Sequence, residues 1–201
     1  MAAYDLLLNM VKSYFQQLGY DEDYIDDYFS PAVFREVLAI KLVNANVVIR
    51  NKRDKTSHQT HIAIVGEATE IFGGMNKYRE LTTSDCLMVP IAISVDNLNE
   101  LKNNSKEIIN RQAILMEKGF VSVGKRTQNQ IQLSKKMSLN SDCFNQLRNC
   151  LFENDLIIFM KYRNNEDVLV VGIRKNFYNT AIEEYDQSYE TNTYLRLPRV
   201  N

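Results

Sequence analysis

The last third of the chain has a pattern of apolar and polar positions that predicts a β-hairpin. Leu156 to Met160 and Val168 to Ile173 are short runs rich in Ile, Val, Leu and Phe, and a polar segment separates them. Apolar runs of this length on either side of a polar turn are typical of paired strands. Immediately before the first run, Leu151, Asn154 and Asp155 predict a turn in which an Asx side chain bonds nearby backbone amides.

Apolar residues at helical spacing predict three helices. The first covers Tyr4 to Leu18, and Gly19 is a suitable residue for its C-terminal cap. A second helix is expected to begin at Ser30-Pro31, because proline is favoured in the first turn of a helix. A third, inserted helix is expected over residues 105–118, and Gly119 marks its end.

Four further segments have the composition and alternation of strands. They are residues 40–50, residues 61–72, the stretch that ends at Val95, and residues 120–124. Pro90 has no amide hydrogen to donate, so the third of these strands is expected at an edge or a bulge. The elements together predict an α+β fold, with a small β-barrel or curved antiparallel sheet, an N-terminal helical extension and one inserted helix.

The length of the chain, 201 residues, is suitable for one domain of moderate size. We expect a helical extension at residues 1–38, a barrel-like recognition domain at residues 39–180, and a linker or tail at residues 181–201. The N-terminus is amphipathic and lacks the basic leader of a signal peptide, and no stretch approaches the roughly 18 apolar residues of a membrane span. A cytoplasmic protein without a membrane partner is therefore expected.

The cysteines and histidines predict no cofactor. Cys86, Cys143 and Cys150 are unevenly spaced and form no CxxC pair, so free, partly buried thiols are expected. His58 and His61 lie three residues apart, but two ligands alone are too few to indicate a metal site. The chain also has no glycine-rich phosphate loop, no His-Glu-x-x-His motif and no nucleophile elbow.

Charge is distributed unevenly along a chain whose net charge is −1. Residues 1–30 carry six acidic side chains and one lysine, whereas residues 41–61 carry five basic side chains and one acidic side chain. Residues 111–148 carry seven basic side chains and two acidic ones. Because a local patch supplies phosphate contacts whatever the net charge, these two basic segments permit nucleic-acid binding without requiring it.

Two polar segments contain the donor and acceptor groups that suit a DNA interface. The first is a predicted hairpin loop that contains residues 50–59, and the second follows the strand that ends at residue 124. In the major groove, arginine can bond guanine through two hydrogen bonds, and asparagine or glutamine can bond adenine in the same way. The candidate DNA-binding residues are Arg50, Lys52, Arg53, Lys55, His58, Gln59, Lys125, Arg126, Gln128, Asn129, Gln130, Lys135 and Lys136.

The predicted hairpin also carries a family resemblance. Leu151, Asp155 and Phe159 form the pattern Leu-x-x-x-Asp-(x)3-Phe, and Val-Leu-Val-Val-Gly-Ile follows the polar turn. Over about 25 residues this sequence resembles the closing hairpin of pseudobarrel DNA-binding domains. These are the plant B-three domains and the recognition domains of some restriction enzymes, including McrBC-like N-terminal domains, in which Leu-x-x-Gly-Asp-(x)3-Phe is usual. The chain differs by having Glu153-Asn154 where a glycine-containing turn is commoner.

The resemblance implies sequence-specific binding of double-stranded DNA, as the target-recognition module of a restriction or modification-dependent restriction system. Two strand-loop arms, assigned by analogy to residues 50–59 and 125–130, would enter the major groove. Arg53 and Arg126 are expected to read guanine. The residues expected to read adenine are Gln128 and Asn129, and those expected to hold phosphates are Lys52, Lys55, Lys135 and Lys136. The expected protein partner is a nuclease or motor domain or subunit.

Three other functions remain open. PUA-like and EVE-like barrels have much the same hairpin, and they would read RNA or a flipped, modified base through an aromatic-lined pocket. A metal-dependent nuclease subunit would use Glu67 or Glu70, although neither residue has the lysine of a Glu-x-Lys pattern. A protein-interaction domain would use the acidic, tyrosine-rich segment from Asp21 to Phe29, a pattern that also suits a solvated helix start.

Overall fold

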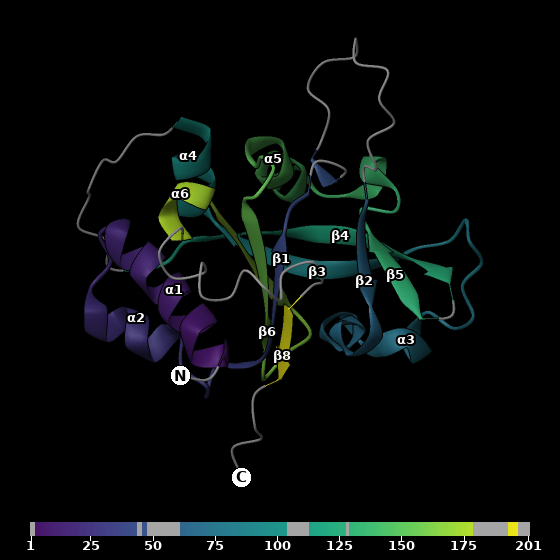
Figure 1. Cartoon of the computed structure of the whole chain (residues 1–201), viewed down its shortest axis with the longest axis horizontal. Helices are drawn as coiled ribbons and strands as arrows, with labels where there is room; N and C mark the ends of the chain where they lie inside the picture. The colour runs from purple at the N-terminus through teal and green to yellow at the C-terminus, as the bar shows by residue number, and fades with distance from the viewer. Residues whose placement is uncertain are drawn as a thin grey trace.

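The structure, a computed structural model, describes residues 3–43, 46–47, 61–103, 113–127, 129–178 and 193–196. One sheet runs through this part of the molecule, and helices pack against its faces and ends (Figure 1). In chain order the elements are α1 (Ala3–Gln17), α2 (Glu22–Tyr28), β1 (Phe34–Lys41), β2 (Ile62–Val65), the 3-10 helix η2 (Gly66–Phe72), α3 (Gly74–Lys77), β3 (Leu87–Ser94), α4 (Val95–Asn103), β4 (Met116–Thr127), β5 (Gln130–Leu133), the 3-10 helix η3 (Met137–Leu139), α5 (Asp142–Cys150), β6 (Leu156–Tyr162), β7 (Val168–Ile173), α6 (Lys175–Tyr178) and β8 (Thr193–Arg196).

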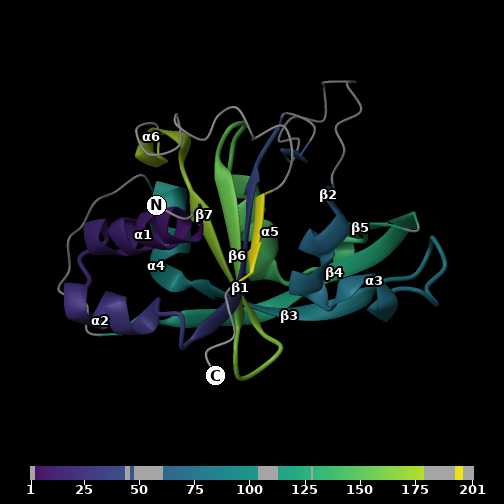
Figure 2. The same ribbon diagram turned by 60° about the horizontal axis from the view of Figure 1, so that its bottom comes forward.

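The sheet has the strand order β2-β5-β4-β3-β7-β6-β1-β8. It curls into a half-barrel, and Figure 2 shows β3 and β4 running across the direction of β6 and β1. Neighbouring strands are antiparallel, with one exception, the parallel pair β3 and β7. The expected α+β fold with a curved sheet is therefore confirmed.

The predicted hairpin and the turn before it are confirmed. β6 and β7 pair in antiparallel register from Leu156 opposite Ile173 to Lys161 opposite Val168. The Asp155 side chain bonds a nearby backbone amide as expected, because its Oδ2 accepts a hydrogen bond from the N–H of Phe152, three residues earlier, at 2.8 Å. Its Oδ1 accepts another from the N–H of residue 175, at 2.9 Å, so this buried carboxylate joins the two ends of the hairpin.

The central strands are buried on both faces, which explains their uninterrupted apolar runs. Ile157 and Phe159 of β6 belong to a core that also contains side chains of β2, β5, η2 and α5. Ile158 and Met160, on the opposite face, belong to a second core with α1 and α2. The strands β1, β6 and β7 therefore contribute to two hydrophobic cores at once.

The first predicted helix is confirmed as α1, and Gly19 has the left-handed backbone conformation of a C-terminal cap, with φ of 89°. The acidic segment forms α2, whose N-cap Asp21 accepts a hydrogen bond from the N–H of Tyr24 at 3.2 Å. The helix expected from Ser30-Pro31 is wrong, because β1 begins at Phe34. Ser30-Pro31 instead opens a turn, in which the N–H of Val33 donates to the carbonyl of Ser30 at 3.0 Å, and proline is favoured early in such a turn as it is at a helix start.

Several boundaries of the other predicted elements need correction. A strand was expected over residues 40–50, but β1 ends at Lys41. Residues 44–45 and 48–50 of that expected strand lie outside the described chain. Of the strand expected over residues 61–72, only β2 is extended, and its second half is the helix η2. Here Thr69 Oγ1 donates to the carbonyl of Gly66 at 2.8 Å, and this local bond favours a helical turn.

The strand with Pro90 is central, not at an edge. β3 lies between β4 and β7, but its pairing with β7 covers only Ile91 to Ile93. Pro90 lies just before that stretch, where β3 has β4 alone as a partner, so its missing N–H breaks no ladder with β7.

The inserted helix expected over residues 105–118 does not match the described chain. Residues 113–115 are not helical, and the strand β4 begins at Met116 and runs through Gly119, while residues 105–112 lie outside the described chain. The helix of this region is α4, which begins at Val95, immediately after β3. The strand expected over residues 120–124 is confirmed as part of β4.

Within the described residues, no helix is long and apolar enough to cross a membrane. Cys86, Cys143 and Cys150 are free thiols, of which Cys143 is buried. Of the predicted tail, residues 193–196 form the edge strand β8 on β1, and the rest of residues 181–201 lies outside the described chain.

Candidate nucleic-acid interface

Part of the predicted DNA-binding set lies at the turn between β4 and β5 and just after β5. Lys125 and Arg126 end β4, Asn129 lies in the turn, and Gln130 begins β5. Two more lysines follow that strand, Lys135 and Lys136. The others lie outside the described chain: Arg50, Lys52, Arg53, Lys55, His58, Gln59 and Gln128.

The two described residues that flank the first predicted arm are joined to each other. Asn46 precedes this arm and His61 follows it, and Asn46 Nδ2 donates a hydrogen bond to the backbone carbonyl of His61 at 3.3 Å. Arg148 of α5 donates to the carbonyl of Asn46 at 2.6 Å. The chain therefore leaves for the first arm and returns from it at one place beside α5.

A chain of side-chain hydrogen bonds connects that place to β5, the strand that follows the second predicted arm. Lys135 Nζ donates to Gln132 Oε1 at 3.1 Å, so the other end of this amide, Nε2, is a donor. Gln132 Nε2 lies 2.8 Å from His61 Nε2, which must then be the unprotonated acceptor of the imidazole. One hydrogen-bond network thus runs from Asn46, before the first arm, through His61 to Gln132 and Lys135, which follow the second arm in the chain.

The surroundings of this network are strongly basic. The pKa of His61 is lowered from its ordinary value, first by partial burial and then by the charges of Arg126, Lys135 and Arg148. The Arg148 side chain is 3% exposed, and burial lowers its pKa to about 10, so the guanidinium stays charged at neutral pH. We name this cluster of His61, Arg126, Lys135, Lys136 and Arg148 the basic edge.

The backbone is shaped to hold Lys135 in this cluster. A Cβ atom on Gly124 would lie 2.6 Å from Lys135 Cγ and 2.9 Å from the carbonyl of Asp85, so only glycine leaves room for the lysine chain. Ser134 has a left-handed backbone, with φ of 58°, a conformation that is unusual for a residue other than glycine. Its strained turn directs the chain back over β4 immediately after β5.

The turn that carries Lys135 and Lys136 is also fixed by Ser122 of β4. The N–H of Lys136 donates to Ser122 Oγ at 3.0 Å, and Ser122 Oγ donates to the carbonyl of Lys136, also at 3.0 Å. Asn140 Oδ1 accepts from the N–H of Ser122 at 2.6 Å. Both lysines therefore start from a rigid backbone, although the Lys136 side chain is exposed.

Arg126 is the extra residue of a β-bulge. Lys125 pairs with Ile131 and Thr127 with Gln130, so two residues of β5 face three residues of β4. A bulge turns a side chain away from the regular alternation of a strand. Arg126 is exposed and is close enough to His61 to lower its pKa, so a bound anion can reach it at the basic edge.

Lys125 has a partner within the chain. It is half-buried, and its Nζ donates to the carbonyl of Arg79 at 3.0 Å, which ties the end of β4 to the segment after α3. Lys136, in contrast, is exposed, and its charge is one of the smaller causes that lower the pKa of Asp85.

Several residues of the site were not among the DNA-binding candidates from the sequence. His61 and Gln132 bond each other, Arg148 bonds the carbonyl of Asn46, and Gly124 and Ser134 make room for Lys135 and turn the chain. The sequence held a signal for two of them: Gln132 is a polar residue between Ile131 and Leu133, and Gly124 is a glycine within a predicted strand. No local pattern marks a serine with a left-handed backbone or a buried helical arginine.

The described residues contain no metal centre of the kind that a metal-dependent nuclease would need. Glu67 and Glu70 are both exposed on η2, and no group of three or more His, Cys, Asp or Glu side chains in the described part of the chain could hold a metal ion. His61 bonds Gln132 and Asn46, and its predicted metal-binding companion His58 lies outside the described residues.

Comparisons with protein-family models, with curated proteins and with solved structures give no match to this chain.

Proposed function

We propose that this chain binds double-stranded DNA sequence-specifically through the basic edge. The observation that supports this proposal is the hydrogen-bond network from Asn46 to Lys135, because it joins the two ends of the first sequence-predicted arm to the strand that follows the second, at one charged place. Two arms supported from one place can contact one duplex together, whereas two separate basic segments would not form a single interface.

The charges at the basic edge support contacts with phosphate. Arg126, Lys135 and Arg148 are all near enough to His61 for their charges to lower its pKa, so three cations gather at one place. An approaching polyanion would release condensed counterions here, which is the main driving force of sequence-independent DNA affinity. Arg126 and Lys136 are exposed here, so they are the described cations best placed for direct contact.

Base readout would come from the turn between β4 and β5 and from the first arm. Arg126 and Asn129 are exposed on this turn, and a guanidinium and an amide are the groups that bond guanine and adenine edges. The resemblance of the β6–β7 hairpin to pseudobarrel recognition domains supports a role as the target-recognition module of a restriction system, with nuclease or motor activity supplied by a partner domain or subunit.

The test is fluorescence anisotropy with a randomised duplex pool at two salt concentrations, followed by selection and sequencing, with methylated and unmethylated pools. Lys118→Ala is the matched control, because this lysine lies on the same strand β4 as Arg126 and its side chain is 79% exposed. Arg126→Ala and Lys136→Ala should each weaken binding and reduce the salt slope by about one. Lys118→Ala should leave both nearly unchanged.

The outcomes separate the alternatives. An enriched motif that depends on Arg126 supports sequence-specific readout. Preference for the methylated pool or for RNA would favour a PUA-like or EVE-like reader. Binding without salt dependence, or equal losses in the Arg126 and Lys118 variants, would refute an interface at the basic edge.

A further inference from the structure

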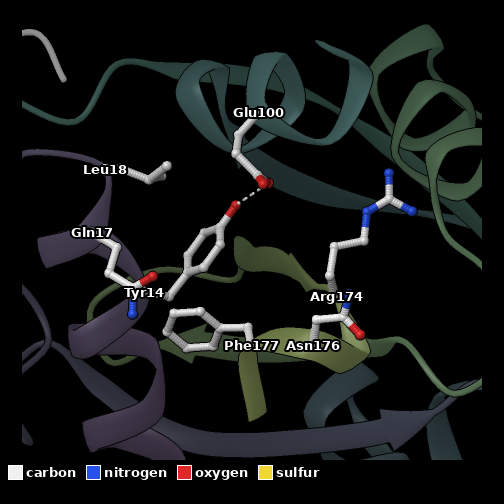
Figure 3. A pocket seen from close by; sticks show the side chains of 7 residues that line it. All are labelled: Tyr14, Gln17, Leu18, Glu100, Arg174, Asn176 and Phe177. Atoms are coloured by element: carbon white, nitrogen blue, oxygen red, sulfur yellow. Dashed lines mark hydrogen bonds between the residues drawn. The ribbon is translucent and has the colours of Figure 1, made fainter. Parts of the chain in front are cut away.

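A second feature, distant from the basic edge, is a cavity of about 330 Å³ between α1, α4 and α6 (Figure 3). In Figure 1 these helices lie at the opposite end of the molecule from β2 and β5. Tyr14 lines the cavity from α1 and Leu18 from just after this helix, Glu100 lines it from α4, and Arg174 and Phe177 line it from just before α6 and from α6 itself. The proposed DNA interface uses none of these residues.

A buried relay of hydrogen bonds orients the polar group of this cavity. Asn97 is fully buried; its Oδ1 accepts from the N–H of Gly172 at 3.0 Å, and its Nδ2 donates to the Gly172 carbonyl at 2.8 Å. Nδ2 also donates to the Tyr14 hydroxyl oxygen at 2.6 Å. The Tyr14 hydroxyl must then direct its own hydrogen to Glu100 Oε2, at 2.9 Å.

Tyr14 keeps its hydroxyl proton and so donates a hydrogen bond to Glu100 at all times. Burial raises the pKa of its hydroxyl well above the ordinary value, so the group stays protonated at any physiological pH. The backbone of β7 therefore fixes the position of a carboxylate on α4 through two intermediate side chains. A buried polar network of this kind rigidifies the groups that it joins.

The Glu100 carboxylate has room for a further partner. Among the described residues, no cation lies within ion-pair distance of it. The nearby Arg174 is already engaged, because Nη2 donates to the carbonyl of Leu101 at 2.8 Å and Nη1 lies 3.4 Å from Asp155 Oδ2. In Figure 3 its guanidinium is turned away from the Tyr14–Glu100 pair, and its aliphatic stem forms a wall of the cavity.

The other walls are aromatic and apolar. The rings of Tyr14 and Phe177 meet edge to face, with their centroids 5.3 Å apart and their planes at 88°. Leu18 adds an apolar side chain. A flat ring can pack on such a surface, and aromatic faces also attract cations.

We propose that this cavity binds a small aromatic cation, in which an amidinium, guanidinium or protonated amine bonds Glu100 and a flat ring packs against Phe177 and Tyr14. A charge-assisted hydrogen bond to a positioned carboxylate would fix the orientation of the ligand. A cavity of this size is at the small end of those that hold organic ligands, so a ligand of one or two rings fits.

The test uses the full chain and three probes of similar shape, namely benzamidine, neutral benzamide and anionic benzoate, in isothermal titration calorimetry and ¹H–¹⁵N NMR. Benzamidine should bind, with shifts at Tyr14, Glu100 and Phe177, and benzamide and benzoate should bind at least about tenfold more weakly. Glu100→Gln keeps the shape of the side chain and should weaken benzamidine binding by about tenfold or more while leaving the circular dichroism spectrum unchanged.

The control variant is Glu80→Gln, which removes an exposed carboxylate outside the cavity and should not change benzamidine binding. Equal affinity for benzamidine and benzamide, unchanged affinity in Glu100→Gln, or no binding of benzamidine would each overturn the proposal. DNA affinity of the Glu100→Gln variant should equal that of the wild type, so failure of one proposal is distinguishable from failure of the other.

Discussion

Asn97 provides the sharpest test of the packing between α4 and the sheet. The parallel pairing of β3 with β7 ends at Ile93 opposite Val170, because β3 gives way to α4 two residues later. The N–H and C=O of Gly172 point into the space where β3 would have continued. The Asn97 side-chain amide bonds both groups, at 3.0 and 2.8 Å, and so replaces the missing strand.

Asn97→Ala should therefore be strongly destabilising. It leaves the N–H and C=O of Gly172 without partners in a buried place, and each such group costs about 1–3 kcal/mol. The expected loss is roughly 2–6 kcal/mol of unfolding free energy, of which water entering the vacated space would recover part. Stabilities of natural domains are about 5–15 kcal/mol, so the loss should be obvious.

Urea denaturation followed by far-UV circular dichroism measures this loss, with the slope of the transition checked for two-state behaviour. Asn99→Ala is the matched control, because Asn99 is exposed on the same helix and the change should stay within about 0.5 kcal/mol. A stability of Asn97→Ala within that range of Asn99→Ala would refute the strand-replacing role of the Asn97 amide.

Three further outcomes are expected. Gly172→Ala would place a Cβ 2.9 Å from Cδ1 of both Leu101 and Leu147, and this overpacking should lower the free energy of unfolding by about 1–3 kcal/mol. The loss should appear as a lower urea midpoint. An unchanged midpoint would contradict the close packing of α4 and α5 on β7. Ser134→Gly should raise the melting temperature, because glycine adopts the left-handed backbone at φ of 58° without the strain of about 1 kcal/mol that serine has. A lower melting temperature would show that the serine side chain contributes more to stability than its backbone strain costs. The pKa of His61 is lower in the folded chain than its ordinary value, so the unfolded chain binds more protons and stability should fall as the pH drops below about 6.5. His61→Gln should reduce this fall in stability. An equal fall in both proteins would argue against a lowered pKa of His61 in the folded chain.

The sequence predicted the parts of the fold in which local pattern and tertiary burial agree. The β6–β7 hairpin has strand propensity, a polar turn and an Asx residue at its entry, and helix α1 has a regular apolar face and Gly19 as a cap. Two predictions failed at prolines, which suit more than one local structure. Ser30-Pro31 begins a turn before β1 and not a helix, and a central strand tolerates Pro90 because its second partner begins one residue later.

The candidate site was predictable only in part, for a physical reason. Basic and amide side chains near residue 126 are visible as a composition, so Arg126 and Lys136 became candidates, and both are exposed; composition did not show that Lys125 is held by the Arg79 carbonyl. Contacts between residues distant in sequence, such as His61 with Gln132 or Arg148 with Asn46, depend on strand order. Strand order has no local signal in the sequence.

The bond between Asn46 and His61 has a consequence for how the first arm can vary. Because the ends of the intervening segment are held together, the entropy of closing it grows only slowly with its length, by about 0.6 kcal/mol for each doubling. Insertions and deletions between the two residues should therefore cost little free energy of folding. The length and sequence of this segment can vary while the bond between its two ends, and the sheet beside it, stay in place.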